Sequence, residues 1–418
     1  MSCELERSEL RILVLSQHFW PESFRINDVV DSLRRAGCAV TVLTGKPNYP
    51  DGEVFAGYRA SGIQREVHPS GYAIYRVPVV PRASGRALAL AANYLSFLFS
   101  ASVLGSKVLR DESFDVIFVY GISPILQAIP AIILRKSKRA AVVTWVQDLW
   151  PQSLESTGFV RNKVLLSVVR GVVRWIYRHS DLLLVQSERF ISNVRAMAER
   201  TPVEYYPNPG DAAFSRVDET ADSALIFPQG FNVVFAGNMG TVQGLDTIVA
   251  AAELLASEDD VRIVLIGSGG RKAWVEAEIA RRGLSNLQLA GRFAGEAMPG
   301  ILSRASALLV TLKGDPIISQ TVPSKIQAYL AAGRPIIAAM NGEGARIVLE
   351  SGGGIACPAE DASALAEAIR RLKQMPADKR EQMGRAGRQY YDSHFEPTML
   401  ANRLVERFRR LVNARDAL

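Results

Sequence analysis

Short apolar runs that alternate with helical patterns along the chain constrain its fold more than any other feature. Buried strands that alternate with amphipathic helices are typical of parallel β-sheets with helices packed on them. The expected strands are 11–16, 39–44, 115–120, 140–146, 182–187 and 203–206, then 232–236, 262–267, 287–290, 307–312, 335–339 and 354–357. The clearest expected helices are 26–36, 245–256, 272–282, 325–332, 362–373 and 397–412.

Segment 205–230 separates the two series of strands. It is rich in Pro, Gly, Asp and Ser and has no sustained period. A chain of 418 residues is long enough for two domains, each with its own core. We therefore expect an α/β fold of two doubly wound, Rossmann-like domains that face each other across a cleft. The expected parts are an N-terminal domain 1–207, a linker 208–230, a C-terminal domain 231–395 and a helix 396–418 that crosses back to the first domain.

Charge and cysteine content narrow the classes of protein that the sequence allows. The formal charge is +7, with 25 Lys and Arg against 18 Asp and Glu in residues 1–210, and 24 against 24 in residues 211–418. A one-sided basic surface favours a phosphorylated ligand, an acidic membrane or nucleic acid, although a merely solvated surface has the same composition. Cys3, Cys38 and Cys357 are odd in number and lack metal-ligand spacing, which favours a reducing cytoplasm. The start MSCELERSEL predicts no signal peptide.

Two glycine-containing turns follow strands of the second series. Gly237 and Gly240 lie in FNVVFAGNMGTVQG, and Gly267, Gly269 and Gly270 precede Arg271 in RIVLIGSGGRKAW. Glycine lets the backbone approach a ligand closely, and the N–H groups that open the next helix attract phosphate. Glycines after strands also make ordinary turns, so each loop alone leaves both interpretations open.

The segment TVPSKIQAYLAAGRP gives a sharper indication of a phosphate site. Pro323 is expected at the first position of a helix, with Ser324 and Lys325 in its first turn. A lysine there is unfavourable unless an anion compensates, because the N-terminus is the positive end of a helix. N–H groups, a hydroxyl and an ammonium could converge on a diphosphate at this point.

Four motifs, GNMGTVQG, IGSGG, PSKIQAYLAAGRP and YPNPGD, together resemble those of the retaining family-4 glycosyltransferases of GT-B fold. The opening LVLSQHFWPESFRINDVVDSLRRAGCAVTVLTGKPNYP and the segment WVQDLWPQSL are similar to the N-acetyl-L-fucosamine transferase branch of O-antigen, capsule and colanic-acid assembly. The resemblance implies a hexosyltransferase that moves a sugar from a UDP-sugar to a polyprenyl-diphosphate-linked glycan. It implies no metal and no cofactor besides this nucleotide-sugar co-substrate, with the acceptor bound by the first domain and the donor by the second.

The family's residue roles carry over only in part. Many members hold the donor diphosphate with Arg and Lys in a loop where this chain has Asn238 and Gln243. Many also carry a Glu-x7-Glu pattern, which appears here as Ser319, on the sugar side, and Gln327, which can still hydrogen-bond a ribose diol. The diphosphate charge is then left to other groups. The expected donor-binding residues are Gly237, Asn238, Gln243, Gly267, Gly269, Arg271, Arg292, Lys313, Ser324, Lys325 and Gln327.

The acceptor is expected at loops that follow strands of the first domain, where open parallel sheets bind ligands. The acceptor-binding candidates are His18, Glu22, Arg25 and Asn27 in QHFWPESFRIND, and Lys46 in GKPNYP, although Phe19, Trp20 and Pro21 in the first loop could simply be packing residues. Asp148 in WVQDLWP and Ser319 are the catalytic candidates; a general base must reach the acceptor hydroxyl. Retaining enzymes of this class are thought to use front-face attack, in which the leaving diphosphate takes the proton and the protein positions and stabilises.

Two segments of the first domain indicate contact with a membrane. In 161–180, Lys163, Arg170, Arg174 and Arg178 recur at helical spacing, and Val164, Leu165, Val168, Val172 and Ile176 lie largely opposite. A basic amphipathic helix is typical of a membrane-surface element, although it could also pack on a sheet, and RKSKR at 135–139 adds charge. Residues 87–106 carry no charge, but Asn93, Ser96 and Ser100 share one face, so a buried or membrane-grazing helix is expected rather than a span. We expect peripheral docking on anionic lipid at the inner face of the cytoplasmic membrane.

Other classes share parts of this pattern. A nonhydrolysing nucleotide-sugar epimerase has the same fold but needs acid and base side chains, and the usual carboxylates are sparse here. A non-catalytic nucleotide- or nucleic-acid-binding module fits the basic first half but explains neither the two domains nor the PSK helix, so nucleic acid is not an expected partner. A dehydrogenase would need Gly-x-Gly-x-x-Gly and a suitably placed acidic residue, which neither glycine loop provides.

Overall fold

The computed structural model describes residues 9–82, 87–156, 162–215 and 225–417. Contacts divide the chain into two compact units, Met1–Pro207 with Pro397–Leu418, and Asn208–Glu396. Segment 208–230, expected as a linker, is grouped with the second unit. Residues 1–8, on which the signal-peptide expectation rests, and residues 216–224 of the expected linker lie outside the described residues.

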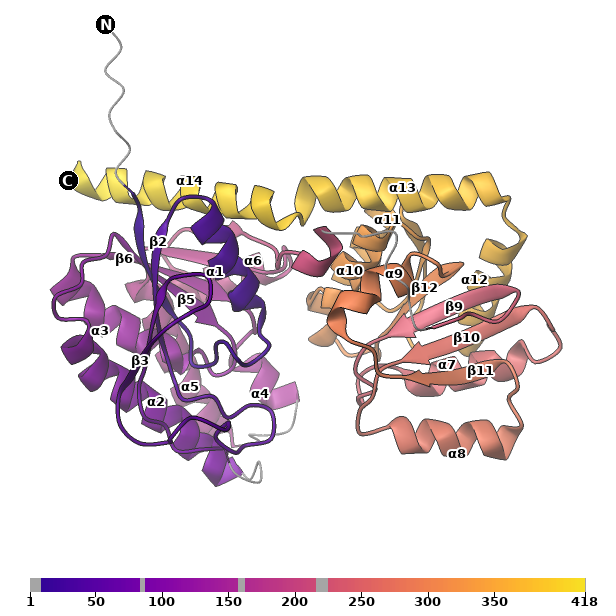
Figure 1. Ribbon diagram of the computed structural model, residues 1–418, viewed down its shortest axis with the longest axis horizontal. Coiled ribbons are helices and arrows are strands. Elements are labelled where there is room, and N and C mark those ends of the chain that lie inside the picture. Colours follow the sequence, from indigo (N-terminus) through magenta and orange to yellow (C-terminus); the bar gives the residue numbers. More distant parts are fainter. Residues whose placement is uncertain (1–8, 83–86, 157–161, 216–224, 418) are drawn as a thin grey trace, which may run out of the picture. The chain divides into compact units, whose positions relative to one another are not determined.

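The first unit is built on an eight-stranded sheet in the order β3-β4-β2-β1-β5-β6-β7-β8 (Figure 1). All neighbouring strands are parallel except the pair β3 and β4. The sequence did not indicate β3 and β4, because QREV and AIYR are only four residues each and β3 contains no apolar run. The strands are β1 (Arg11–Leu15), β2 (Ala39–Thr44), β3 (Gln64–Val67), β4 (Ala73–Arg76), β5 (Val116–Gly121), β6 (Ala141–Val146), β7 (Leu182–Val185) and β8 (Val203–Tyr205).

Helices cover both faces of this sheet. Because side chains alternate along a strand, Ile12 and Val14 join one core and Leu13 and Leu15 the other. Helices α1 (Arg25–Arg35) and α14 (Pro397–Asp416) pack together over the first core, which confirms that the C-terminal helix returns to the first unit. The other core lies under α2 (Ala87–Val108), α3 (Ala128–Lys138), α5 (Lys163–His179) and α6 (Phe190–Ala198), with η1 (Ile125–Gln127) and α4 (Gln152–Ser156) in connecting segments.

The second unit contains a six-stranded, all-parallel sheet in the order β11-β10-β9-β12-β13-β14. The strands are β9 (Phe231–Ala236), β10 (Val261–Ile266), β11 (Leu287–Gly291), β12 (Ala307–Thr311), β13 (Ile336–Ala339) and β14 (Gly354–Cys357). The helices are η2 (Ala212–Ser215), α7 (Leu245–Leu254), α8 (Lys272–Arg282), η3 (Gly295–Ala297), α9 (Met298–Leu302), η4 (Ile318–Gln320), α10 (Ser324–Ala332), α11 (Glu343–Glu350), α12 (Ala362–Gln374) and α13 (Ala377–His394).

Both sheets reverse their strand order beside their first strand, as doubly wound sheets do, and so confirm the expected fold class. The reversal lies between β1 and β5 in the first unit and between β9 and β12 in the second. Ligands of such sheets bind beyond the carboxyl ends of the strands at the reversal. We call this end of each sheet its carboxyl edge, and the loops there position the candidate site.

Helix α5 differs from the sequence-based expectation. Its buried side chains are Leu166, Val173, Ile176 and Tyr177, a stripe at helical spacing that packs on the sheet. Most of the apolar residues expected opposite the basic ones are therefore not on the core side. The exposed members of that set are Val164, Leu165 and Val168.

Candidate functional site

The loops after β9 and β10 meet backbone to backbone at the carboxyl edge of the second sheet. The amide of Gly237 donates to the carbonyl of Ile266 (2.9 Å), and that of Met239 donates to Ser268 (2.7 Å). Gly237 and Gly267 have φ values of 142° and 130°, and a Cβ on Gly267 would lie 2.0 Å from the Gly237 carbonyl oxygen. This close approach leaves no room for a side chain, so glycine is required there. Gly269 is equally tight, since a Cβ there would lie 2.5 Å from Oδ1 of Asn238.

Lys325 lies over the first of these loops. Its Nζ donates to Oε1 of Gln243 and lies 3.7 Å from the centre of the Phe235 ring, a cation–π contact. A Cβ on Gly237 would come within 2.5 Å of its Cε. Helix α10 brings it there, because Lys325 is in the first turn. Pro323 is the N-cap residue and not the first helical residue as expected, since its ψ of 135° is extended.

No acidic side chain among the described residues pairs with Lys325. Burial disfavours its charged form and lowers the pKa of Lys325 to about 7, and no charged neighbour opposes this effect. The ammonium meets only a neutral amide and an aromatic ring. An anion bound at this place would supply the missing charge, which is the arrangement that the sequence predicted for a diphosphate.

Arg271 is also at this edge but is already paired. Its Nη2 donates to Oδ1 of Asp246 at 3.0 Å, and its guanidinium stacks on the Trp274 ring at 3.8 Å. The hydrogen bond with Arg271 lowers the pKa of Asp246 below its usual range. Asp246 was not among the residues expected from the sequence, although the first turn of a helix such as α7 is a common favourable position for an acidic residue.

The other expected donor residues lie at different distances from this centre. The amide of Lys313, just after β12, donates to the Val242 carbonyl (2.9 Å), which joins it to the loop that holds Gln243. Asn238 and Ser324 are exposed beside the same loop and helix start. Arg292 is exposed but follows β11, the edge strand, and lies two strands away from β9.

Ser319 and Gln327, which replace the family's two glutamates, are held by local contacts. The Ser319 hydroxyl donates to the Pro316 carbonyl at 2.8 Å. Gln327 is 2% exposed, and its amide nitrogen donates to the carbonyls of Pro323 (3.0 Å) and Ser324 (3.1 Å). Gln327 thus braces the first turn of α10, which carries Lys325, and its role toward a ribose stays a prediction.

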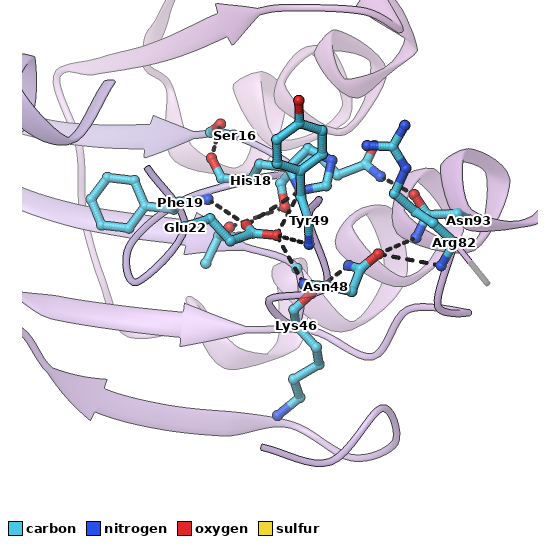
Figure 2. A network of polar contacts seen from close by, with 12 residues as sticks. Ser16, His18, Phe19, Glu22, Lys46, Asn48, Tyr49, Arg82 and Asn93 are labelled. Atoms are coloured by element: carbon cyan, nitrogen blue, oxygen red, sulfur yellow. Dashed lines mark hydrogen bonds and ion pairs between the residues drawn. The ribbon is translucent and has the colours of Figure 1, made fainter. Parts of the chain in front are cut away.

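Glu22 is the centre of a buried network at the carboxyl edge of the first sheet (Figure 2). Its carboxylate accepts hydrogen bonds from the amides of Phe19 (3.1 Å), Asn48 (2.9 Å) and Tyr49 (2.8 Å), and contacts His18 Nδ1 at 3.0 Å. Glu22 and His18 are 2% and 3% exposed. The two residues tie the loop after β1 to the loop after β2.

The other acceptor candidates take part in the same closed loops. Asn27 accepts from the Trp20 amide (3.1 Å) and donates to the Glu22 carbonyl (2.8 Å). Arg25 pairs with Asp28 at 2.9 Å. Lys46 is 2% exposed and donates to Gln64 at 3.0 Å; burial, followed by the nearby charge of Arg76, lowers its pKa. These residues shape the loops, and a direct role toward an acceptor stays a prediction.

Asp148 lies just beyond β6, next to the strand-order reversal, and is partly exposed. Its Oδ2 accepts from the amide (2.9 Å) and the hydroxyl (2.8 Å) of Ser123, which follows β5. The Trp150 indole nitrogen donates to the same hydroxyl at 2.8 Å. The carboxylate is therefore held in one orientation, as positioning a substrate hydroxyl would require. Ser123 was missed, although its place after a strand was a usable signal.

Three glutamines at this edge have buried amide atoms without a partner among the described residues. They are Gln17 Oε1 after β1, Gln147 Nε2 after β6 and Gln186 Oε1 after β7. Buried polar atoms are nearly always hydrogen-bonded, to protein, water or ligand. Across the described part of the chain, no group of three or more His, Cys, Asp or Glu residues could hold a metal ion.

Comparison with known proteins identifies curated relatives and structures of the same fold. The chain is 29% identical over 305 residues to the probable glycosyltransferase WbjE of Pseudomonas aeruginosa, covering 67% of this chain and 70% of the relative. It is 26% identical over 345 residues to the putative colanic acid biosynthesis glycosyl transferase WcaI of Escherichia coli K12, covering 78% and 82%.

Solved structures with the same fold cover almost the whole chain. Sucrose-phosphate synthase of Thermosynechococcus elongatus superposes with a TM-score of 0.72 at 18% identity, over 97% of this chain and all of the other. Anabaena Alr3699/HepE, solved in complex with UDP-glucose, gives a TM-score of 0.61 at 15% identity, over 96% of this chain and all of the other. At these identities the likeness shows the fold alone.

Two family models match the two units. "Glycosyl transferase 4-like domain" matches residues 23–209, and "Glycosyl transferases group 1" matches residues 230–374. These matches favour glycosyl transfer over the epimerase and the non-catalytic binding module. With both units matched over most of their length, the chain belongs to the glycosyltransferases of GT-B fold.

Proposed function

We propose that this glycosyltransferase moves a sugar from a UDP-linked donor, bound at the carboxyl edge of the second sheet, to a polyprenyl-diphosphate-linked glycan bound by the first unit. The sugar is a hexose derivative, with N-acetyl-L-fucosamine the first candidate, and the product is a surface polysaccharide such as O-antigen or capsule. The observation that carries the proposal is the position of Lys325, half-buried against a glycine loop with no acidic partner among the described residues.

The second unit offers a diphosphate three kinds of complementary group. Lys325 provides one positive charge, and the exposed Ser324 beside it provides a hydroxyl. The open amides at the start of α10 add donors at a positive helix end. Several UDP-binding structures share this fold, including Alr3699/HepE, which supports UDP as the nucleotide.

The first unit offers neutral hydrogen-bonding groups, as sugar hydroxyls require. The unpartnered amide atoms of Gln17, Gln147 and Gln186 lie after three different strands of one sheet. The closed network around Glu22 fixes the loop that carries Gln17. We infer that the acceptor glycan binds beside the loops that carry these glutamines.

The reaction needs no protein nucleophile in this scheme. The bond between the anomeric carbon and the diphosphate oxygen breaks, and the acceptor hydroxyl oxygen bonds to the same face of that carbon, so configuration is retained. The hydroxyl proton passes to the leaving diphosphate oxygen. Lys325 stabilises the negative charge that develops on UDP, Asp148 orients the acceptor hydroxyl, and Ser319 lies toward the donor sugar.

A panel of nucleotide sugars tests the proposal. Purified protein is incubated with UDP-N-acetyl-L-fucosamine, other UDP-sugars and GDP-sugars, with polyprenyl-diphosphate-linked N-acetylhexosamine as acceptor. We expect a lipid-linked disaccharide from a UDP-sugar, with the donor's anomeric configuration by NMR. Transfer from GDP-sugars alone, an inverted linkage, or an epimerised nucleotide sugar without transfer would each overturn part of the proposal.

A further inference from the structure

Three helices of the first unit carry much of the exposed apolar surface. Of the 17 exposed large apolar side chains in the described residues, nine lie on α2, α3 and α5: Leu88, Leu95, Phe99, Val103, Ile133, Val164, Leu165, Val168 and Trp175. The three helices cover the same side of the sheet (Figure 1), and α3 contacts both α2 and α5. We call their outward surface the three-helix face.

Helix α2 packs on the sheet with one side and exposes large apolar side chains on the other. Asn93, Phe97 and Ala101 are buried against the sheet, whereas Leu95 and Phe99 are 56% and 69% exposed. It is also the single helix in the described parts of the chain that is long and apolar enough to cross a membrane. Apolar side chains on the surface of a helix are stabilised by a protein partner or by lipid. Because its inner side belongs to the domain core, only its outer side is free to meet lipid.

Helix α5 adds positive charge to the same face. Lys163, Arg170 and Arg174 are exposed, and no acidic residue lies between Glu155 and Asp181 in the sequence. Val164 and Val168, between these cations, are 74% and 58% exposed. A partner for this surface must accept apolar side chains and cations together, which an anionic phospholipid bilayer does.

The apolar side chains at the starts of α2 and α5 lie toward the end of the domain that holds the candidate acceptor site. Helices α2 and α5 each follow a parallel strand, so each begins at the carboxyl edge of the sheet. Leu88 and Val164 are in their first turns. Asn93, one turn further along α2, accepts a hydrogen bond from Gln17 in the loop after β1 (2.7 Å).

We propose that the three-helix face docks on an anionic phospholipid bilayer, with the outer side of α2 and the start of α5 among the acyl chains and the α5 cations at the headgroups. The inference rests on the proposed function in one respect: a lipid-linked acceptor then presents its diphosphate-sugar beside the first carboxyl edge without leaving the membrane. The helix grazes the bilayer and does not span it.

Vesicle flotation of the full chain tests this surface. Wild type floats with vesicles of phosphatidylglycerol and phosphatidylethanolamine, and part of the binding persists in high salt because the apolar contacts are not screened. Leu95→Glu with Phe99→Glu lowers vesicle binding about tenfold or more, because two large apolar side chains are replaced by anions. Leu254→Glu with Leu349→Glu, two exposed leucines of the second unit, is the matched control and binds like wild type.

The readouts separate this inference from the proposed function. Donor binding and transfer to a short-chain, water-soluble acceptor are measured on the same variants and stay unchanged, which also shows that they fold. Vesicle binding that salt abolishes, or that the α2 substitutions leave intact, would overturn the inference even if transfer occurs. So would a wild-type dimer in sedimentation that only the α2 substitutions dissociate, since a second copy would then cover this face. Vesicle binding without any sugar transfer would support the docking surface and would contradict the proposed function.

Discussion

The carboxyl edges of the two sheets differ in whether the protein compensates the charge that each carries. In the first unit, a buried carboxylate, Glu22, accepts from three backbone amides and contacts His18, so its charge is matched within the fold. In the second unit, Lys325 is half-buried beside Gln243 and a glycine loop, with no acidic partner in the described chain. At the first edge, groups of the protein itself compensate the charge of Glu22. At the second edge, no acidic group of the described chain compensates the charge of Lys325.

From this difference we expect the first edge to contribute mainly to stability and the second mainly to ligand binding. A charge satisfied by the protein contributes to folding, and its removal leaves several buried groups without a hydrogen-bond partner. A charge left unsatisfied lowers the stability of the free protein, and a bound anion restores that stability by compensating the charge. Substitutions at the two edges should therefore separate the free energy of unfolding from nucleotide affinity.

The largest expected effect is that of Glu22→Ala on stability. Loss of the carboxylate leaves the buried amides of Phe19, Asn48 and Tyr49 without an acceptor, which should lower the free energy of unfolding by about 3–5 kcal/mol. Urea unfolding followed by tryptophan fluorescence measures it, because four of the five tryptophans lie in the first unit.

Glu22→Gln provides the matched control for that experiment. Its amide oxygen can still accept from Asn48 and Tyr49, so the loss should be smaller than for alanine. Equal unfolding midpoints for wild type and Glu22→Ala would mean that the network does not hold these loops together, and the contrast between the edges would fail.

Lys325→Met should produce the opposite pattern. The Kd for UDP rises about 10- to 100-fold, because one charge-assisted contact worth about 1.5–3 kcal/mol is lost. The melting temperature stays the same or rises, because a poorly compensated buried cation is removed. Lys272→Met is the control, since Lys272 on α8 is exposed and pairs with Glu276 at 3.2 Å. Calorimetric titration with UDP that gives the same Kd for wild type and Lys325→Met would refute the site.

Protonation of Lys325 should be linked to nucleotide binding. In the free protein its pKa is lowered to about 7, so the side chain is mostly neutral above that pH. A bound diphosphate favours the charged form and raises the pKa again, so binding near about pH 8 takes up close to one proton. In the same pH range the unfolded chain binds this proton more strongly than the folded protein does. The free energy of unfolding of the unliganded protein should therefore increase as pH rises from about 7 toward 10.5. Titrations in two buffers of different ionisation enthalpy detect the uptake; equal heats in both would contradict it.

A smaller effect is expected from Gly237→Ala. The added Cβ would meet Cε of Lys325 at 2.5 Å and displace the ammonium, so UDP should bind about tenfold more weakly. Gly283→Ala is the control: it also has a positive φ, 63°, but a Cβ there meets nothing within 4 Å. Gly283→Ala should lose about 1–2 kcal/mol of stability from backbone strain, and Gly237→Ala should lose more, because its φ of 142° lies outside the left-handed helical region. Similar UDP affinities in the two would show that Lys325 is not placed by this glycine.

Most of the fold could be predicted because parallel strands buried on both faces are continuous apolar runs. Strand β9 was expected at 232–236 and is Phe231–Ala236, and α8 was expected at 272–282, as found. The hairpin of β3 and β4 was missed because an exposed edge strand needs no apolar residues. Local composition therefore identifies the buried sheet better than its edge.

The candidate site could be predicted where it depends on local chain chemistry. The first-turn position of Lys325 followed from the pattern Pro-Ser-Lys before an apolar period. The roles of Glu22 and Gln327 could not be predicted, because their partners are backbone groups: the amides of Asn48 and Tyr49, which only the fold brings near Glu22, and carbonyls that α10 turns back toward Gln327. Because nearly every residue has the same backbone groups, the sequence does not indicate which of them will bind a given side chain.

The smallest expected effect is that of Asp246→Asn on the second edge. This carboxylate holds Arg271 and adds a negative charge close to the expected diphosphate, so its neutralisation should tighten UDP binding about threefold. The pair is partly exposed, so stability should change by less than about 1 kcal/mol. If UDP binds more weakly to Asp246→Asn, then Asp246 instead positions Arg271 for the ligand. The second edge would in that case depend on an internal ion pair as the first depends on Glu22, and the contrast between them would narrow to Lys325 alone.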